Sequence, residues 1–166
     1  MVQPSVAFNI RILEDVPAAI PVLAEWFHAE WNRFDGRSVA EITAQLQHCL
    51  NRESLPITFV ALSDSQVIGT VTLDTSDLPH FDHLTPWLAS LYVLPSRRGD
   101  GIGRALVEHV VSHAQRQSIS PIYLWTPGST HLYEKCGWQF LRCDIYSGQP
   151  ITLMQRTSKS MDIANE

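Results

Sequence analysis

The sequence has few cysteines, and their arrangement excludes two common kinds of site. They stand at Cys49, Cys136 and Cys143. Their number is odd and no pair has the C-x-x-C spacing, so the chain offers neither a disulfide framework nor a paired-cysteine motif for metal or redox chemistry. Unpaired cysteines are typical of a reducing compartment, and we therefore expect a cytoplasmic protein.

Long hydrophobic runs are also lacking. The most apolar stretch near the start, Val16 to Ala24, is short and is interrupted by Pro17 and Pro21, so it cannot span a membrane. The first fifteen residues lack the basic flank and apolar run of a signal peptide. We expect neither a leader segment nor a membrane partner.

Positive charge is scarce as well. Twelve Lys and Arg residues against seventeen Asp and Glu residues give a formal net charge of -5. Nucleic-acid backbones are bound by clustered basic side chains, and only Arg97, Arg98 and Arg104 form such a cluster, around one loop. We therefore expect no nucleic-acid partner.

The length and composition that remain are those of a soluble globular protein. The chain has 166 residues, of which 45% are hydrophobic and 17% are charged. This length is enough for one domain with a single core. We predict one domain over residues 1–166, with a polar tail from about Ser158.

The most informative stretch is 91–107, LYVLPSRRGDGIGRALV. An apolar run ends at Pro95, glycines follow at every second position from Gly99 to Gly103, and apolar residues then recur at helical spacing to about Gln117. This pattern predicts a strand, a glycine loop and a helix. Glycine lets successive backbone N–H groups turn toward one point, and the helix adds its positive end. The stretch thus predicts a phosphate or pyrophosphate site.

Spacing separates the known glycine motifs. No lysine stands where a Walker loop needs one, and the third glycine of a Rossmann fingerprint is missing from either possible start. What remains is Arg98-x-x-Gly101-x-Gly103 after Val-Leu-Pro. An ordinary strand-turn-helix corner, in which the glycines serve geometry alone, is the alternative at this point.

Periodicity and turn residues place the other elements. Ser38 and Glu41 match a capping box, and Thr126 is expected to cap a short helix with Pro127 at its first position and Gly137 at its end. The predicted strands cover residues 7–13, 57–62, 67–73, 87–94, 121–126, 138–146 and 150–156, and the predicted helices cover 14–31, 38–52, 102–117 and a segment between 126 and 137.

The loop motif resembles the acetyl-CoA loop of the GNAT superfamily of N-acetyltransferases, whose pattern is Gln or Arg, two residues, Gly, one residue, then Gly or Ala. A second segment, His131 to Trp138 (HLYEKCGW), is similar to that family's LYEKxGF segment. The element order also matches. The resemblance, which covers Phe8 to Arg156, implies an α/β (α+β) fold with a mixed central sheet of about seven strands and helices on both faces.

The resemblance implies acetyl-CoA as co-substrate and places its contacts. Backbone groups of Leu91, Tyr92 and Val93 would pair with the pantetheine arm, and an amide near Val93 and Leu94 would polarise the thioester, where the family parts two parallel strands. The diphosphate contacts would fall on Arg98, Gly99, Asp100, Gly101, Ile102, Gly103 and Arg104. Many members have an Asn at the start of the last helix that contacts the cofactor. This sequence has no Asn there, and Ser129 is the nearest polar substitute.

Acetyl transfer to an amine needs an acid for the leaving thiolate and a route for the amine proton. The family carries its acid at the position of Tyr133, and a core aromatic is the alternative role for this residue. For the base, the candidates are His80 and His83, with Asp82 beside them and Asp74 at the end of the preceding strand. A water chain is the other route.

Metal binding competes for the same side chains. His109 and His113 lie one helical turn apart, but the Glu of a zinc-protease motif is absent and His113 falls on the apolar stripe of its helix. We therefore expect no metal.

The first two predicted helices are expected to form the acceptor wall, with Glu25, Trp26, His28, Glu30, Trp31, Phe34 and Asp35, although an amphipathic helix with core tryptophans would have the same pattern. Aromatic faces and carboxylates suit a cationic amine.

We expect direct attack by a small primary amine in a ternary complex, without an acyl-enzyme on Cys136. The alternatives are a peptide N-terminus or lysine as acceptor, and a non-catalytic acyl-CoA sensor. The expected assembly includes the option of a homodimer.

Overall fold

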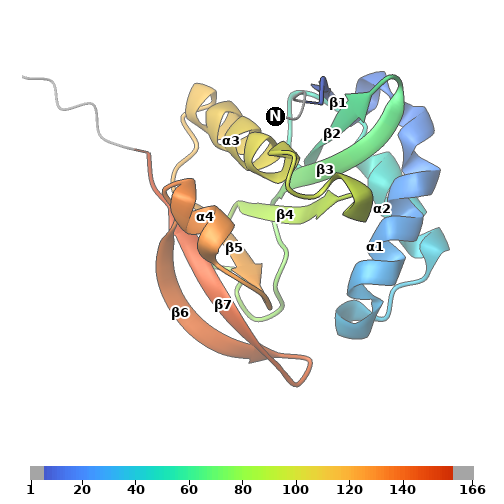
Figure 1. Cartoon of the computed structure of the whole chain (residues 1–166). Helices are drawn as coiled ribbons and strands as arrows, with labels where there is room; N and C mark the ends of the chain where they lie inside the picture. Colours follow the sequence, from blue (N-terminus) through green and yellow to red (C-terminus); the bar gives the residue numbers. More distant parts are fainter. Residues whose placement is uncertain (1–5, 159–166) are drawn as a thin grey trace, which may run out of the picture.

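The computed structural model describes residues 6–158, and they are organised around one seven-stranded sheet (Figure 1). The strand order is β1-β2-β3-β4-β5-β7-β6. All neighbours are antiparallel except β4 and β5, which are parallel. The strands are β1 (Asn9–Ile12), β2 (Ile57–Ser63), β3 (Gln66–Asp74), β4 (Trp87–Val93), β5 (Ile122–Thr126), β6 (Gln139–Tyr146) and β7 (Gln149–Arg156). The expected mixed sheet of about seven strands is thus confirmed.

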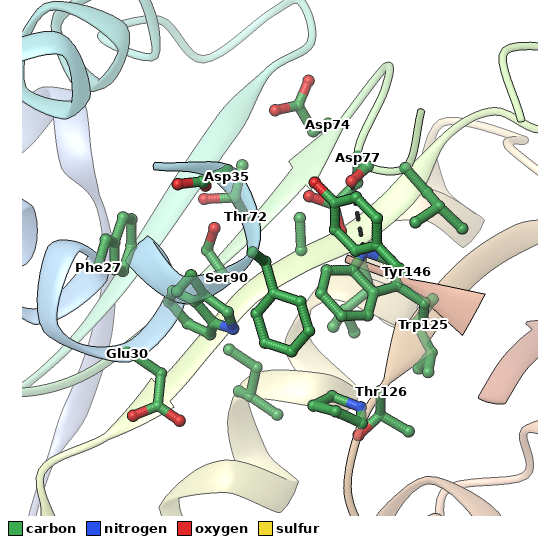
Figure 2. Close-up of a pocket in the computed structure, with 18 of the residues that line it drawn as sticks. Phe27, Glu30, Asp35, Thr72, Asp74, Asp77, Ser90, Trp125, Thr126 and Tyr146 are labelled. Atoms are coloured by element: carbon green, nitrogen blue, oxygen red, sulfur yellow. Dashed lines mark hydrogen bonds between the residues drawn. The ribbon is translucent and has the colours of Figure 1, made fainter. Parts of the chain in front are cut away.

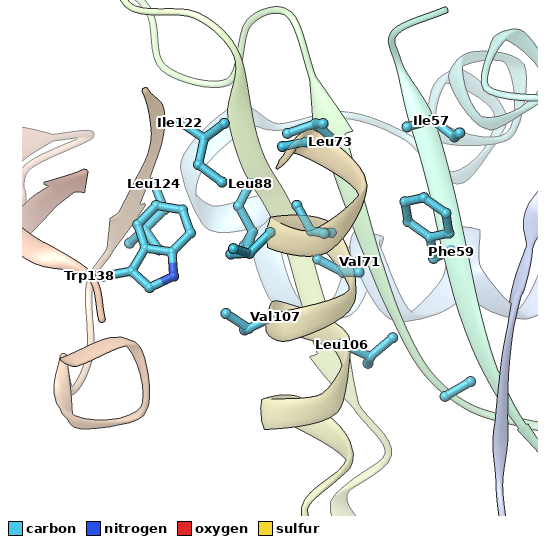
Figure 3. Packing of buried hydrophobic residues seen from close by; sticks show 14 of the residues in the cluster. Ile57, Phe59, Val71, Leu73, Leu88, Leu106, Val107, Ile122, Leu124 and Trp138 are labelled. Atoms are coloured by element: carbon cyan, nitrogen blue, oxygen red, sulfur yellow. The ribbon is translucent and has the colours of Figure 1, made fainter. Parts of the chain in front are cut away.

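The helices cover both faces of the sheet, as expected. They are α1 (Ile20–Asp35), α2 (Val39–His48), α3 (Ile102–Arg116) and α4 (His131–Lys135). The side of α3 that carries Leu106 and Val107 packs on β2, β3 and β4 (Figure 3). On the opposite face α1 and α2 pack against Leu13 and Val60. The three longer helices are each held by a buried apolar side, which is the main source of helix stability in water.

The helix starts follow the sequence signals in one case and depart from them in another. Ser38 Oγ accepts a hydrogen bond from the Glu41 amide and Glu41 Oε2 accepts one from the Ser38 amide, so the predicted capping box is confirmed. The helix that we expected to start at residue 14 instead begins at Ile20, after two short 3-10 turns, Leu13–Asp15 and Pro17–Ala19. The first of these turns buries Leu13 under α1, which explains the later start.

The expected cap of the last helix is wrong. Thr126 stays in β5, opposite Thr152 of β7, and its Oγ1 accepts a hydrogen bond from the Gly128 amide to form a turn. The helix begins only at His131. Pairing with β7 therefore outcompetes capping at this position, while Gly137, at φ +82°, follows the helix as expected.

A third packed cluster covers the C-terminal strands. Leu78, in the loop between β3 and β4, packs with Trp87, Ile151 and Leu153.

No helix within residues 6–158 has the length and hydropathy needed to cross a membrane.

Helix α3 lies very close to the sheet at Gly69 of β3. A Cβ atom there would lie 3.0 Å from Leu106 Cδ1 and 3.1 Å from the Tyr92 carbonyl oxygen. The Leu106 side chain can shift, but the Tyr92 carbonyl is backbone of the neighbouring strand β4 and cannot yield in the same way, so β3 has room only for glycine under α3.

We predict that Gly69→Ala lowers the free energy of unfolding by about 1–3 kcal/mol through overpacking. Gly103→Ala is the matched control, because a Cβ there meets nothing nearer than 3.6 Å and alanine is the better helix former. Urea denaturation of both variants checks this, and equal stability of the two would contradict it.

Candidate active site

The two parallel strands separate almost as soon as they meet. Their ladder has a single pair, Trp87 with Tyr123, and the Tyr123 amide donates to the Pro86 carbonyl at 3.0 Å. Beyond that point the edge of β4 that faces β5 has no strand partner. The separation that the family resemblance implied is therefore present.

Backbone groups of β4 point into this gap. The Leu94 amide donates to the Ile68 carbonyl of β3 at 2.9 Å. Residues of an antiparallel ladder alternate between facing the neighbouring strand and facing away, so Val93 directs its N–H and C=O toward the unpaired side. An extended polar chain can pair there as an added strand would.

Arg98 occupies part of the gap. Its Nε donates to the Val93 carbonyl at 3.0 Å, and its guanidinium lies 5.5 Å from the centre of the Tyr92 ring. Tyr92 in turn packs against Trp26, with 4.9 Å between ring centres. A cation–π contact and one hydrogen bond thus hold Arg98 along the end of the strand.

A bulge lies in the middle of β4, and sequence reasoning missed it. The register with β3 shifts between Thr70 and Thr72, and Ser90 opposite this shift has φ +54°. A bulge re-aims neighbouring backbone and side chains, and Ser90 and Leu91 both line a cavity here. Serine carries no sequence signal for such a conformation.

The predicted glycine loop and helix start are present. Gly99 and Gly101 have φ of +89° and +80°, and α3 begins directly after Gly101. The amides of the first helical residues have no partner within the helix, and the helix dipole is positive at this end. The exposed loop can therefore bind an anion through its backbone.

The three arginines around this loop diverge. Arg97 Nη2 donates to Ser63 Oγ at 3.2 Å, and Arg104 pairs with Glu108 at 2.9 Å. Together with the position of Arg98, this leaves no converged basic cluster at the loop. Backbone amides, rather than a basic patch, dominate the anion-binding character.

A cavity of about 810 Å³ opens on the other side of the gap. It is bounded by α1, α2, the segment after β3, the bulge of β4, the end of β5 and the β6–β7 turn, and Figure 2 shows many of its side chains. The turn is tied to α1 by a hydrogen bond of 2.8 Å from Ser147 Oγ to the Phe34 carbonyl. The cavity is thereby closed on that side.

Carboxylates outnumber cations in the wall. Glu30, Asp35, Asp74 and Asp77 line the cavity together with Arg33 and Arg37. Arg37 Nη2 pairs with Asp35 at 2.7 Å. Among the described residues the other three carboxylates form no ion pair, so the cavity favours a cation.

Aromatic rings enclose one end of the cavity. Phe34 stacks on Tyr146 with 5.7 Å between ring centres, and Trp125 meets both rings edge-on at 5.2 and 5.3 Å. Asp77 lies beside this group, and the Trp125 indole N–H donates to its backbone carbonyl at 3.3 Å (Figure 2).

The surroundings of Asp77 oppose ionisation. Burial raises its pKa well above that of an ordinary carboxyl, and the negative charge of Asp74 adds to the effect, while Trp125 and Arg37 offset part of it. Sequence reasoning did not single out this residue, because burial alone separates it from the exposed Asp82 of the same loop.

Tyr133 of α4 lines the cavity, as its predicted role requires. Burial raises the pKa of its phenol to about 12, with a smaller contribution from Cys136. The Trp138 ring lies edge-on at 6.3 Å. The phenol is therefore protonated at neutral pH and can act as a proton donor.

Of the four candidate bases, Asp74 lines the cavity and the other three do not. His80 and His83 are exposed and are not among the residues that line the cavity. Asp82 is exposed too. A direct contact with a ligand in the cavity would require movement of their loop. Ser129 is also exposed, and its Oγ accepts a hydrogen bond from the His131 amide at 3.2 Å.

The expected acceptor wall is present in part. Its members that line the cavity are Glu30, Trp31, Phe34 and Asp35. Trp26 instead packs on Tyr92, His28 Nδ1 bonds to the Arg37 carbonyl, and Glu25 is exposed away from the cavity.

The two helix histidines are half-buried and pack against the sheet. His109 and His113 pack on Phe59 at 4.6 and 5.3 Å between ring centres, and burial lowers the pKa of both. Over residues 6–158, no three His, Cys, Asp or Glu side chains are gathered as a metal site requires.

Comparison with known proteins agrees with this geometry. The sequence model of the Acetyltransferase (GNAT) family matches residues 20–138, which is more than half of the chain. None of the curated proteins matches the sequence.

Solved structures share the fold at low sequence identity. The aminoglycoside 6'-acetyltransferase type Ii is 20% identical with a TM-score of 0.68, covering 90% of this chain and 96% of that one. An aminoglycoside 6'-N-acetyltransferase complexed with coenzyme A is 17% identical, with a TM-score of 0.69 and the same coverage of 90% and 96%. A spermidine N-acetyltransferase SpeG chimera from Vibrio cholerae and hSSAT is 19% identical with a TM-score of 0.69, covering 90% and 95%.

The buried phenol leads to a prediction on titration. We expect the Tyr133 Cζ resonance, measured by ¹³C NMR and assigned by its loss in Tyr133→Phe, to stay at its protonated position from pH 7 to about 10.5, where an ordinary tyrosine is mostly ionised. The reason is that the ionised phenolate would lack solvation in the cavity wall. A midpoint at or below about pH 10 would contradict this prediction.

Proposed function

The chain belongs to the GNAT acetyltransferase family, and from this premise we propose that it moves the acetyl group of acetyl-CoA to a primary amine of a small molecule by direct attack in a ternary complex. The observation that carries the proposal is the gap between β4 and β5. On one side it continues into the glycine loop, and on the other it opens onto the acidic cavity that Tyr133 lines. One domain supplies both sides of the site.

The residues along the gap fit a coenzyme A molecule. The outward N–H and C=O of Val93, with the neighbouring backbone of Leu91, suit the amides of a pantetheine arm, whereas the same alternation turns the N–H and C=O of Tyr92 toward β3. When bound, acetyl-CoA supplies the thioester that is the acetyl donor. The amides of the loop and helix start suit its diphosphate; these residues are Gly99, Asp100, Gly101, Ile102, Gly103 and Arg104. The fold relative solved with coenzyme A supports this choice.

Arg98 has two roles in this proposal. It pairs with the Val93 carbonyl before the donor binds, so that this outward-facing acceptor has a protein partner. A pantetheine amide competes for the same carbonyl, and the freed guanidinium then lies within the same segment as the diphosphate-binding amides.

Ser129, at the start of α4, is the proposed substitute for the asparagine found there in many members.

Polarisation of the thioester falls to backbone at the end of β4. The Leu94 amide is already paired with β3, so of the two expected residues Val93 is the one whose N–H faces the gap. Such a donor suits the negative charge that develops on the carbonyl oxygen. It is fixed in place before the reaction and therefore needs no reorganisation.

Tyr133 is the proposed acid. It gives its proton to the departing sulfur as the C–S bond breaks. A thiol pKa near 8.5 is well below the pKa of this phenol, but the burial that raises the phenol pKa also raises the pKa of a thiolate released in the same cavity. The pKa values of the phenol and of the thiol therefore rise together, and the free-energy cost of the proton transfer between them stays small.

The acceptor is proposed to be a cationic small amine. Carboxylates that lack ion-pair partners attract it, and aromatic faces such as Trp31 and Phe34 stabilise its charge. The Ser147 hydrogen bond fixes the β6–β7 turn as one wall of the cavity, and a walled cavity of about 810 Å³ suits a small molecule. Two fold relatives whose names specify aminoglycoside and spermidine acetylation support the same substrate class.

We predict that purified protein releases thiol from acetyl-CoA in the presence of at least one member of a panel of polyamines, aminoglycosides, amino acids and short peptides. Tyr133→Phe should lower kcat by about 10²–10⁴-fold while calorimetry shows coenzyme A binding within threefold of the parent protein. Binding without turnover across the whole panel would identify a sensor, and turnover with peptides alone would identify a peptide acetyltransferase.

The acidic wall gives a second prediction. Glu30→Gln should raise KM for a cationic amine by about two- to fivefold, the effect of one exposed charge, and added salt should shrink the difference. Glu25→Gln is the matched control, since Glu25 lies on the same helix but is not among the lining residues. Equal KM values for the two variants at low salt would contradict the proposed cation site.

A further inference from the structure

Asp77 is a half-buried carboxyl in the cavity wall. It follows β3 by three residues, and the next residue, Leu78, is 2% exposed. The Trp125 indole fixes its backbone, and the rings of Trp125 and Tyr146 lie beside it (Figure 2), with Phe34 packed against both rings. Its position is therefore set by packing rather than by a flexible loop.

The charged groups that face Asp77 come from several elements. Asp74 is at the end of β3, Asp35 and Arg37 lie at the end of α1 and in the following loop, and Tyr146 belongs to β6. Arg37 is engaged by Asp35 and by Gln45. Asp77 itself forms no ion pair among the described residues, so no cation contacts its carboxylate directly.

Asp74 differs from Asp77 in the hydrogen bonds that its carboxylate accepts. Asp74 Oδ1 accepts hydrogen bonds from the Thr75 amide at 2.7 Å and from Thr75 Oγ1 at 3.4 Å. These bonds engage the Asp74 carboxylate in the loop that follows β3. At Asp77, burial and the charge of Asp74 raise the pKa more than Trp125 and Arg37 lower it, so this carboxyl gains from taking up a proton.

We propose that Asp77 accepts the proton of the incoming ammonium, and thereby acts as the general base of the reaction. This inference rests on the proposed acetyl transfer. It assigns to a residue of the cavity wall the role that sequence reasoning gave to His80 and His83, which lie outside that wall.

The proton and electron balance is simple. An N–H bond of the ammonium breaks and an O–H bond forms on Asp77, which leaves the nitrogen lone pair free to attack the carbonyl carbon. The C–S bond then breaks and the sulfur takes the Tyr133 proton. The second amine proton returns to Tyr133, and Asp77 releases its own to solvent, so one proton is set free in each turnover.

Burial favours the proton transfer from the ammonium to Asp77 by acting on both groups. An ammonium loses solvation in the enclosed end of the cavity, which lowers its pKa, while the same surroundings raise the pKa of Asp77. The two values therefore approach each other, and the transfer becomes less costly than it would be in water.

The test compares pH profiles of kcat/KM, measured by thiol release with the fastest amine of the panel. The parent enzyme should lose activity on the acid side with an ionisation above that of an ordinary carboxyl. In Asp77→Asn this acid limb should vanish and kcat should fall by about 10²–10⁴-fold, with KM changed less than about threefold. Asp74→Asn should keep the acid limb, and Asp64→Asn, on an exposed turn, should match the parent enzyme.

Stability gives a readout independent of activity. Because the folded pKa of Asp77 is raised, the stability that this carboxyl contributes is complete below about pH 3.9 and is lost as pH rises through the folded value. Asp77→Asn should therefore melt at a higher temperature than the parent protein at neutral pH and should equal it at acid pH. Asp77→Ala with added formate provides a second variant, in which the formate should restore turnover.

The outcomes separate two failures. Thiol release by the parent enzyme together with an unchanged acid limb in Asp77→Asn would overturn the assignment of the base and leave the proposed function intact. The assignment also fails if KM rises at constant kcat, or if the limb disappears only in His80→Asn with His83→Asn. Absence of thiol release with every amine would overturn the proposed function itself.

Discussion

The structure depends on a single interrupted strand pairing. The parallel strands β4 and β5 share one register pair, Trp87 with Tyr123, and then diverge. Unpaired backbone in a protein interior is costly unless something else satisfies it. Here Arg98 bonds to the Val93 carbonyl, while the glycine loop, the bulge at Ser90 and the cavity all border the same opening. The fold thus gives up ladder hydrogen bonds where it gains a place for an extended ligand.

The cavity wall shows the same exchange of stability for chemistry. A shielded carboxyl without an ion pair, such as Asp77, destabilises the folded chain whenever it is ionised. The aromatic side chains of Phe34, Trp125 and Tyr146 compensate by burying apolar area around it and by holding the β6–β7 turn against α1. Charge repulsion and apolar packing in the cavity wall therefore balance each other locally.

Much of the fold was predictable from sequence because it is encoded locally. The glycines at 99 and 101 specify a turn with positive φ, and Ser38 with Glu41 specifies a helix start. Hydrophobic periodicity located α3 and the strands to within two residues. The late start of α1 was placed less well, since burial of Leu13 under α1 depends on contacts between distant segments.

The parts of the site that sequence reasoning missed arise from tertiary contacts. Ser90 adopts its unusual backbone only because β3 and β4 change register, and Asp77 differs from Asp82 only in which neighbours cover it. Histidine chemistry favoured His80 and His83 as bases, but composition does not tell whether a loop residue faces the interior. The capping potential of Thr126 was outcompeted by pairing with β7 for the same reason.

The single register pair between β4 and β5 also means that hydrogen bonds of the sheet alone do not hold its two parts together. Side chains do so instead. One buried core runs from Val71 and Leu88 to Leu124 and Met154, and Ser147 bonds to the Phe34 carbonyl on the other face. The width of the opening is therefore set by the volume of packed side chains, so a change of size in this core would alter the opening without touching its lining.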